Sequence, residues 1–475
     1  MRARLLPFAL ILGALPLSLP GLADAPRPRV APAHQSLAAR VELTFERFVL
    51  PNGLEVILHE DHRTPIVAVS LDYHVGSKDD PPGKSGVAHL FEHVMYNGSR
   101  NVPAGMFEKY LAQAGVSASN GSTNVDVTSY YETLPASELA LALWLESDRM
   151  ASLLDRLDQA SFDREREVVK NERRQRYENS PYGLVVPVAI RNSLYPEGHP
   201  YHNASMGVPA ELDAASLDDV RAFFKRYYVP GNASLVIAGD IQKPRARELV
   251  ERYFGRVPKG ADPAAKRAPM PVSLASEVRI DVEADVELSR VYVVWPTVTR
   301  YAPGSTELDL LSMVLSLGKS SRLHKRLVYD LQIAQAVSAD ADSALLAGVF
   351  YISVLLKKDT PVEKVLKEID AELAKMQAGG PTEEEMERAR SVIIPNMLFG
   401  LEAETTRAAV LNNEAYFAGD PGYLSKHLAQ IEALAPADLK AAAQKLLPLD
   451  RRLVAVVTPT PGAPKGGRLV KRSKP

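Results

Sequence analysis

Three side chains in one short segment, His89, Glu92 and His93, are the residues of this chain best suited to chemistry. Positions i and i+4 of a helix project from the same face, so the two histidines can present imidazole nitrogens to one metal ion while Glu92 lies beside them. The segment predicts a helix over 87–96 whose apolar residues can be buried on the opposite face. The spacing matches the inverted zinc motif H-x-x-E-H. The alternative is a core helix with two hydrogen-bonded histidines and a surface glutamate.

A catalytic zinc site needs a third protein ligand and an open position for water. Residues 162–177 read as a helix in which Glu165 and Glu172 share a face with Val168 and Val169, at i, i+7, i+3 and i+4. The valines predict that this face points to the core, where a carboxylate is costly unless it binds a cation. Either glutamate is therefore a candidate ligand. The alternative is that both only pair with arginines of the same helix.

The composition of the chain excludes several kinds of catalytic and binding site. The chain has 475 residues, 56 basic and 58 acidic side chains, a formal net charge of -2 and no cysteine. Thiol catalysis, disulfides and thiolate metal sites are excluded, so a metal must be held by histidine and carboxylate. A nearly neutral chain without a large basic block argues against nucleic acid as a partner.

The first 25 residues have the order of a secretory signal peptide: two arginines, an apolar run from Leu5 to Leu19 and then small residues. The run is too short to span a bilayer comfortably, although an N-terminal anchor is the alternative. We expect cleavage after Ala23 or Ala25 and no membrane span afterwards. The mature protein is therefore expected to be exported.

The elements that must position the motif are predicted to form two similar α+β halves, each with an antiparallel-rich sheet packed with helices. Both halves end alike, because a helix from Leu217 leads to a strand at Leu235 and a helix from Pro436 leads to a strand at Leu453. We expect five regions: signal peptide 1–25, metal-binding catalytic domain 41–256, Pro/Gly linker 257–275, second domain without the motif 276–458, and a basic disordered tail 459–475.

With these residues in view, the chain resembles the pitrilysin/insulinase family of zinc metallopeptidases, in the short form related to mitochondrial processing peptidase and bacterial zinc proteases. In that family the H-x-x-E-H helix is followed, some 75 to 80 residues later, by a glutamate that completes the site, with another glutamate seven positions before it. The resemblance implies His89, His93 and Glu172 as ligands of one zinc ion, Glu92 as general base and Glu165 as a supporting carboxylate.

The resemblance extends to both sides of the motif. The stretch Asn120-Gly121-Ser122-Thr123 is similar to the family's strand beside the cleft, where an extended substrate pairs its backbone with the strand edge. Asn120 is a candidate substrate contact, with simple turn chemistry as the alternative. Many members carry an arginine and a tyrosine in the second half that contact substrate. Arg326 is the candidate arginine, and Gln335 stands where the tyrosine is expected.

These features predict a zinc-dependent endopeptidase that hydrolyses peptides or unfolded polypeptides in an enclosed chamber, exported to a bacterial periplasm. The resemblance implies a homodimer, or a heterodimer with a related chain. One alternative is a metal-bearing or structural subunit that is inactive alone and needs a partner to supply the Arg/Tyr pair. Another is a zinc hydrolase of non-peptide substrates. The segment holding His199 and His202 is interpreted as structural.

Overall fold

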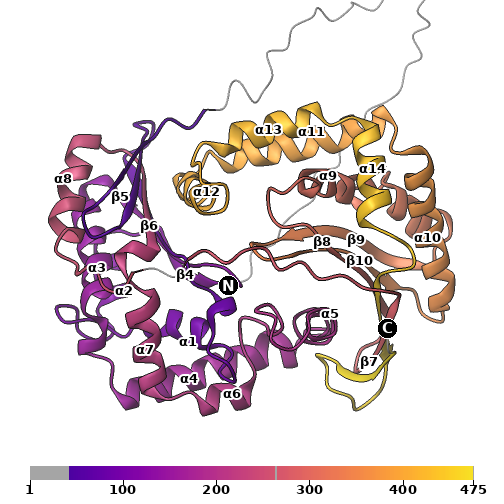
Figure 1. Cartoon of the computed structure of the whole chain (residues 1–475), viewed down its shortest axis with the longest axis horizontal. Coiled ribbons are helices and arrows are strands. Elements are labelled where there is room, and N and C mark those ends of the chain that lie inside the picture. Colours follow the sequence, from indigo (N-terminus) through magenta and orange to yellow (C-terminus); the bar gives the residue numbers. More distant parts are fainter. Residues whose placement is uncertain (1–41, 263–264, 474–475) are drawn as a thin grey trace, which may run out of the picture. The chain divides into compact units, whose positions relative to one another are not determined.

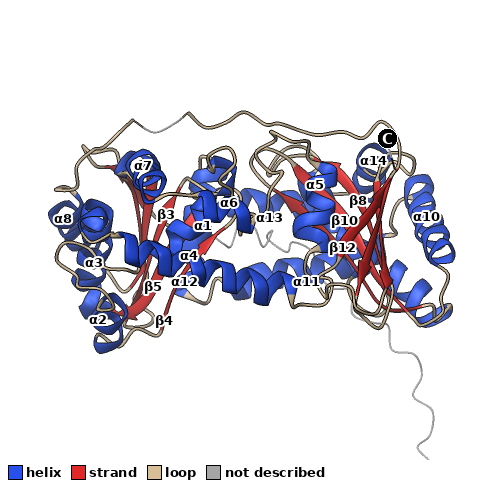
Figure 2. Ribbon diagram, turned by 90° about the horizontal axis from the view of Figure 1, so that it is seen from below, coloured by secondary structure: helices blue, strands red, loops and turns tan. Residues whose placement is uncertain are grey.

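Two six-stranded sheets of similar topology organise the computed structural model, which describes residues 42–262 and 265–473. These described residues all belong to one compact unit. The proposed signal segment, with its cleavage sites, lies outside the described residues. Figure 1 follows the elements along the chain, and Figure 2 shows helices packed on both sides of the strands.

The first sheet has the strand order β1-β2-β6-β3-β5-β4, in which only the β2/β6 pair is parallel. Its strands are β1 (Glu46–Val49), β2 (Glu55–Glu60), β3 (Ile66–Tyr73), β4 (Ala118–Thr123), β5 (Thr128–Pro135) and β6 (Ala233–Gly239). Its helices are α1 (Val87–Val94), α2 (Phe107–Gln113), α3 (Leu139–Ser152), α4 (Gln159–Arg173), α5 (Arg191–Leu194), α6 (Pro209–Ala214), α7 (Leu217–Tyr227) and α8 (Lys243–Phe254).

The second sheet repeats this arrangement in the order β12-β7-β11-β8-β10-β9, again with one parallel pair, β7/β11. Its strands are β7 (Val278–Ala284), β8 (Arg290–Thr297), β9 (Ala334–Ser343), β10 (Gly348–Leu356), β11 (Leu453–Pro459) and β12 (Arg468–Arg472). Its helices are α9 (Ser305–Ser316), α10 (Val362–Gly379), α11 (Glu383–Gly400), α12 (Glu404–Phe417), α13 (Tyr423–Ala433) and α14 (Pro436–Leu446). The predicted α+β class with two similar halves is confirmed.

The end of the chain corrects one expectation. The sequence predicts disorder over 459–475, but Arg468–Arg472 form β12, antiparallel to β7, and the prediction was wrong for these residues. The strand forms because β7 would otherwise be an unpaired sheet edge, and Arg468 also bonds to Glu283 across the pair at 3.0 Å. In the first sheet the same place beside β2 is taken by β1, which comes from the start of the half.

Each half lends helices to the other half's sheet. The α12 helix of the second half covers one face of the first sheet, where Leu411 packs with Ile57 and Val236. In return, the π-helical segment Val185–Ile190 and α5 cover a face of the second sheet, where Ile190 joins a cluster of strand side chains. The remaining helices bury the other faces of the two sheets, which forms the two main cores.

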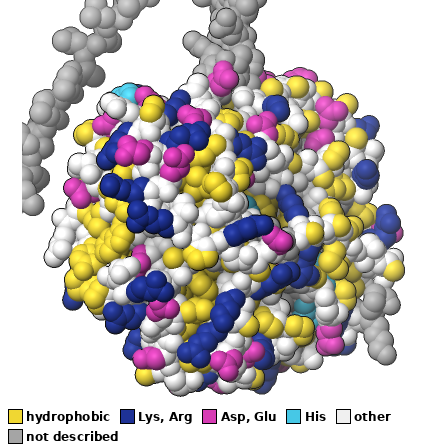
Figure 3. All heavy atoms as spheres, turned by 60° about the vertical axis from the view of Figure 1, so that its left-hand side comes forward, with side chains coloured by type: hydrophobic (Ala, Val, Ile, Leu, Met, Phe, Trp, Pro, Cys, Tyr) yellow, Lys and Arg dark blue, Asp and Glu magenta, His cyan; other side chains and the backbone are white. Residues whose placement is uncertain are grey.

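No helix in the described ranges is both long and apolar enough to cross a bilayer. The face of the molecule drawn in Figure 3 carries Lys/Arg and Asp/Glu side chains interspersed with apolar ones. This mixture agrees with the near-zero net charge of the sequence.

Candidate metal centre

The α1 helix positions the motif by burying its apolar side in the first core. Val87, Leu90 and Phe91 are fully buried there. The helix begins after Gly86, whose φ of 92° is in the left-handed region that suits glycine. The carboxylate of Asp80 accepts hydrogen bonds from the backbone N–H groups of Gly86, at 2.7 Å, and Ala88, at 2.8 Å. Burial raises the pKa of Asp80 to about 8. The beginning of the helix is thus held in place by a partly buried side chain that the sequence analysis did not single out.

Glu172, from α4, meets the two histidines of α1. Its Oε2 atom lies 3.2 Å from Nε2 of His93 and 3.6 Å from Nε2 of His89. The two imidazole rings are nearly perpendicular, with centroids 4.9 Å apart. The other carboxylate oxygen of Glu172 forms an ion pair with Arg176 at 2.9 Å.

These atoms fit a metal ion better than they fit one another. Oε2 of Glu172, the oxygen that faces both histidines, is buried and makes no hydrogen bond. Zinc bonds of about 2.0–2.1 Å in a tetrahedron place neighbouring ligand atoms roughly 3.3 Å apart, close to the two separations above. The candidate ligand atoms of His89, Glu92 and His93 also lie within 4.8 Å of one another. The donor set of imidazole and carboxylate suits zinc.

His89 is held in the form that binds metal. Burial, with smaller contributions from His93 and Arg176, lowers its pKa to about 3. The imidazole is therefore unprotonated at neutral pH, and a nitrogen lone pair is available to a cation.

Glu92 lies between the histidines and strand β4. Its Oε2 atom accepts a hydrogen bond of 2.6 Å from the hydroxyl of Thr123. Gly121 lets the strand come this close, because a Cβ atom there would lie 3.1 Å from Cγ of Glu92. Burial raises the pKa of Glu92, against the lowering effects of Thr123 and His93. A carboxyl group with a raised pKa and one fixed oxygen is suited to take and return a proton.

Strand β4 is an edge of the first sheet, because it pairs only with β5. Asn120 is exposed on this strand, and its Oδ1 atom accepts from the N–H of Gly121 at 2.9 Å. A local bond of this kind is the alternative to a substrate contact for Asn120. The edge itself offers backbone groups to an extended chain beside Glu92.

The other predicted residues lie further from the motif. Glu165 is half-buried and pairs with Arg164 at 3.3 Å, and Arg164 also donates to Asn97, just beyond the end of α1, at 3.0 Å. Val168 is 41% exposed, so the prediction that it faces the core was wrong. Glu167 of the same helix is exposed and accepts a hydrogen bond from Lys170 at 2.9 Å.

In the second half, Arg326 donates to Glu368 of α10 at 2.8 Å. This ion pair lies within the second half, between the π-helical segment His324–Asp330 and α10. Gln335 lies exposed on β9. The ring nitrogens of His199 and His202 are all within hydrogen-bonding distance of neighbouring groups, as the structural interpretation of that segment expects.

Two contacts of the site escaped the sequence analysis in different ways. Thr123 lies in a stretch that was recognised for its edge, but its bond to Glu92 depends on the approach of β4 to α1. Asp80 lies six residues before Gly86, too far for the usual capping pattern, so only the turn that brings it back reveals its role.

Two family descriptions and a bacterial zinc protease match this chain. Residues 55–199 match the family described as Insulinase (Peptidase family M16), and residues 214–393 match the one described as Peptidase M16 inactive domain. Zinc protease PqqE of Helicobacter pylori is 30% identical over 373 residues, which are 77% of this chain and 82% of that protein.

Solved structures agree with these matches. A crystal structure of a protease from Helicobacter pylori has a TM-score of 0.82 at 28% identity and covers 88% of this chain and 100% of that one. The periplasmic protease PqqL from Escherichia coli has a TM-score of 0.71 at 17% identity, covering 91% of this chain and 48% of that one. The latter likeness is one of fold.

Proposed function

The chain belongs to the insulinase/pitrilysin family (peptidase family M16), and from this premise we propose that it is a zinc-dependent endopeptidase acting on peptides or unfolded polypeptides. The observation that carries the proposal is the meeting of His89, His93 and Glu172 around one point, with Glu92 between them and the open edge of β4. In this proposal the three residues hold one zinc ion per chain. Glu165 supports them through Arg164, which reaches the end of α1.

A bound zinc ion would supply Lewis acidity, which lowers the pKa of water from 15.7 to about 7. Glu92 then accepts the proton of the attacking water and returns it to the leaving amine. Thr123 fixes one oxygen of Glu92, so the other oxygen is the proton carrier. The raised pKa of Glu92 brings it closer to the working pH, which favours both transfers.

The edge of β4 binds the substrate backbone as an added strand, and Asn120 contacts it from the exposed side. Main-chain pairing of this kind accepts many sequences. This is the reason for preferring polypeptides over a non-peptide substrate. The relatives' names support the class, since PqqE is named a zinc protease.

One observation favours a second candidate, a subunit that needs a partner for activity. Arg326 is engaged by Glu368, and Gln335 stands where the family's tyrosine is expected, so this chain lacks a ready pair to contact substrate from its second half. A related chain, or a second copy in an enclosing dimer, would then supply these groups. Export to a periplasm is proposed from the N-terminal segment of the sequence and from the periplasmic location named for PqqL.

The test is Glu92→Gln in the purified full chain. Metal analysis is expected to show one zinc per chain in the wild type and in the variant, while the rate of peptide cleavage falls about 10²- to 10⁴-fold. Cleavage by the variant at the wild-type rate would rule out this role for Glu92. If the wild-type chain binds zinc but cleaves only after a partner chain is added, the second candidate is correct.

A further inference from the structure

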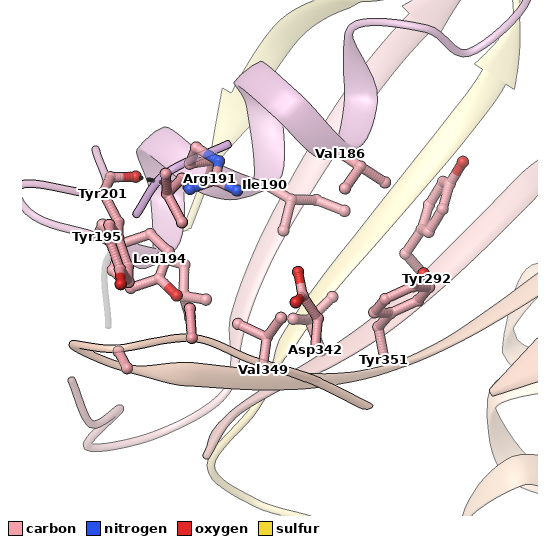
Figure 4. Close-up of a pocket in the computed structure, with 14 residues that line it drawn as sticks. Val186, Ile190, Arg191, Leu194, Tyr195, Tyr201, Tyr292, Asp342, Val349 and Tyr351 are labelled. Atoms are coloured by element: carbon pink, nitrogen blue, oxygen red, sulfur yellow. Dashed lines mark hydrogen bonds between the residues drawn. The ribbon is translucent and has the colours of Figure 1, made fainter. Parts of the chain in front are cut away.

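A small apolar pocket lies where the first half covers the second sheet. It has a volume of about 120 Å³. Val186, Ile190 and Leu194 line one side from the helical segment, and Val349 and Tyr351 line the other from β10. Figure 4 shows the side chain of Ile190 facing Val349 and Asp342 across the open space.

The helical segment on the second sheet packs less closely than α12 packs on the first sheet, and the pocket is the space left. Where α12 covers the first sheet, small and branched side chains interlock, and Asn412 is fully buried with bonds to Ser70 and Ser234. Over the second sheet, Val186 remains 41% exposed and Val349 only partly buried. Apolar walls thus face an open space that the chain does not fill.

The pocket shares lining residues with a second hollow that includes a hydrogen-bond partner of Glu92. A larger hollow of about 300 Å³ shares Val125, Arg191 and Asp342 with it and extends to Thr123, the residue that bonds to Glu92. Tyr177, five residues after Glu172, lines the same hollow. A chain leaving the edge of β4 near Gly121 can therefore pass Thr123 and Val125 and reach the pocket.

The size and walls of the pocket indicate what can enter. A cavity of about 150 Å³ lined by apolar side chains accommodates a benzene ring, so 120 Å³ suits one ring-sized side chain. Four tyrosines contribute to the lining, and aromatic pairs add to simple burial. Arg191 and Asp342 carry opposite charges, so the pocket has no net charge that would favour a charged side chain.

We propose that this pocket binds a phenylalanine-sized side chain of the polypeptide substrate and thereby selects where the chain is cut. The proposal rests on the proposed function, because the metal centre supplies the cut. Gly121 and Val125 are four residues apart, at most about 13 Å along an extended strand. The anchored side chain should therefore lie about three to five residues from the cleaved bond.

The experiment scans phenylalanine through a fluorogenic decapeptide with an alanine background, using the full chain with its metal. We expect kcat/KM to rise about 10- to 100-fold with phenylalanine at one position, three to five residues from the cut, from the burial of one aromatic side chain. Equal rates for all positions would overturn the proposal.

Two variants fill the pocket from opposite walls. In Val349→Phe and Ile190→Phe, the ratio of rates for the phenylalanine and alanine peptides should fall to about one. The matched control is Val337→Phe, because Val337 is also a partly buried strand residue of the second sheet but lies outside the pocket. It should keep the wild-type ratio. Thermal denaturation checks that each variant is folded, and a ratio that survives in both folded variants would contradict the proposal.

A binding measurement separates this proposal from the proposed function. Fluorescence anisotropy on the Glu92→Gln chain compares the best phenylalanine peptide with its alanine counterpart, and we expect 10- to 100-fold tighter binding of the former. If the wild type does not cleave but this preference in binding persists, the proposed function fails and the pocket stands. If the wild type cleaves with no preference in either measurement, only the pocket proposal fails.

Discussion

The two halves of the chain share one topology and differ in the helix that follows the fourth strand of each sheet order, β3 or β8. After β3 comes α1, and after β8 comes α9, each begun by a left-handed glycine, Gly86 or Gly304. The two helices also contact equivalent neighbours, namely α4, α7 and β4 for α1, and α11, α14 and β9 for α9.

Counting from the two glycines shows what the second half has in place of the motif. Glu92 corresponds to Leu310, and His93 corresponds to Leu311. Both leucines are fully buried in the second core. The fold is therefore complete without the metal-binding side chains, and the first half keeps buried polar groups at a cost that a metal ion would offset.

The largest effect is expected from removing the proposed third ligand. Glu172→Ala should weaken zinc binding at least about a hundredfold, because even changes behind the ligands cost ten- to a hundredfold. Isothermal titration with zinc measures it. Glu167→Ala is the control, since it removes an exposed carboxylate from the same helix. Glu165→Ala should weaken zinc binding less than Glu172→Ala, and the reverse order would make Glu165 the ligand.

A reciprocal exchange between the helices is expected to have the next largest effect. Leu311→His places a polar ring in the closed core and should lower the free energy of unfolding by about 3 kcal/mol. His93→Leu should change that of the metal-free protein by less than about 1 kcal/mol, while abolishing zinc binding. Urea denaturation of both metal-free variants measures the difference. Equal losses in the free energy of unfolding would show that α1 tolerates such a substitution no better than α9.

Acid should weaken the contact between the first half and α12, because His74 lies in that contact. Its ring stacks on Tyr416 of α12 at 4.2 Å, and burial, with Lys78 and Lys266, lowers its pKa to about 3. Since the unfolded chain takes up this proton near pH 6.5, stability is present above that pH and is lost as the pH falls toward 3, by about 2–4 kcal/mol.

Urea unfolding between pH 7 and pH 4 measures this loss in the metal-free protein. His74→Phe keeps a ring against Tyr416 but removes the titration, so its stability should vary less with pH than that of the wild type. An unchanged pH dependence would assign the loss to other groups, among them His89.

The smallest effect is expected from removing β12, the edge strand of the second sheet beside β7. Ending the chain after Gly467 removes β12 and should cost about 1–2 kcal/mol, because the strand is exposed along its length and contributes mainly backbone hydrogen bonds. Thermal denaturation measures it. Loss of folding altogether would show that β12 is as necessary as an internal strand.

Sequence patterns predicted elements whose ends are fixed locally. The helix from Leu217 was predicted from its local sequence, and in the structure Ser216 and Asp219 form a reciprocal cap at its start. The H-x-x-E-H helix was also recognisable, since motif spacing and apolar periodicity agree over eight residues. In both cases the information lies within a few residues of the element.

Features that depend on distant partners were not predictable. The orientation of Val168 depends on how α4 rotates against α1, and one position of error turns a helical side chain by 100°. The engagement of Arg326 depends on Glu368, 42 residues later. Likewise β12 forms because β7 offers an open edge, which the tail's composition cannot reveal.

Because α12 of the second half packs on the first sheet, that sheet is made long before the helix that covers it. The last strand of that sheet ends at Gly239, but α12, which covers it, ends only at Phe417, 178 residues later. At about 5–20 residues per second, synthesis leaves the apolar face of a finished sheet bare for roughly 10–35 s. The growing chain therefore exposes this face to solvent until α12 has been made, and only then can the first sheet reach its final packing.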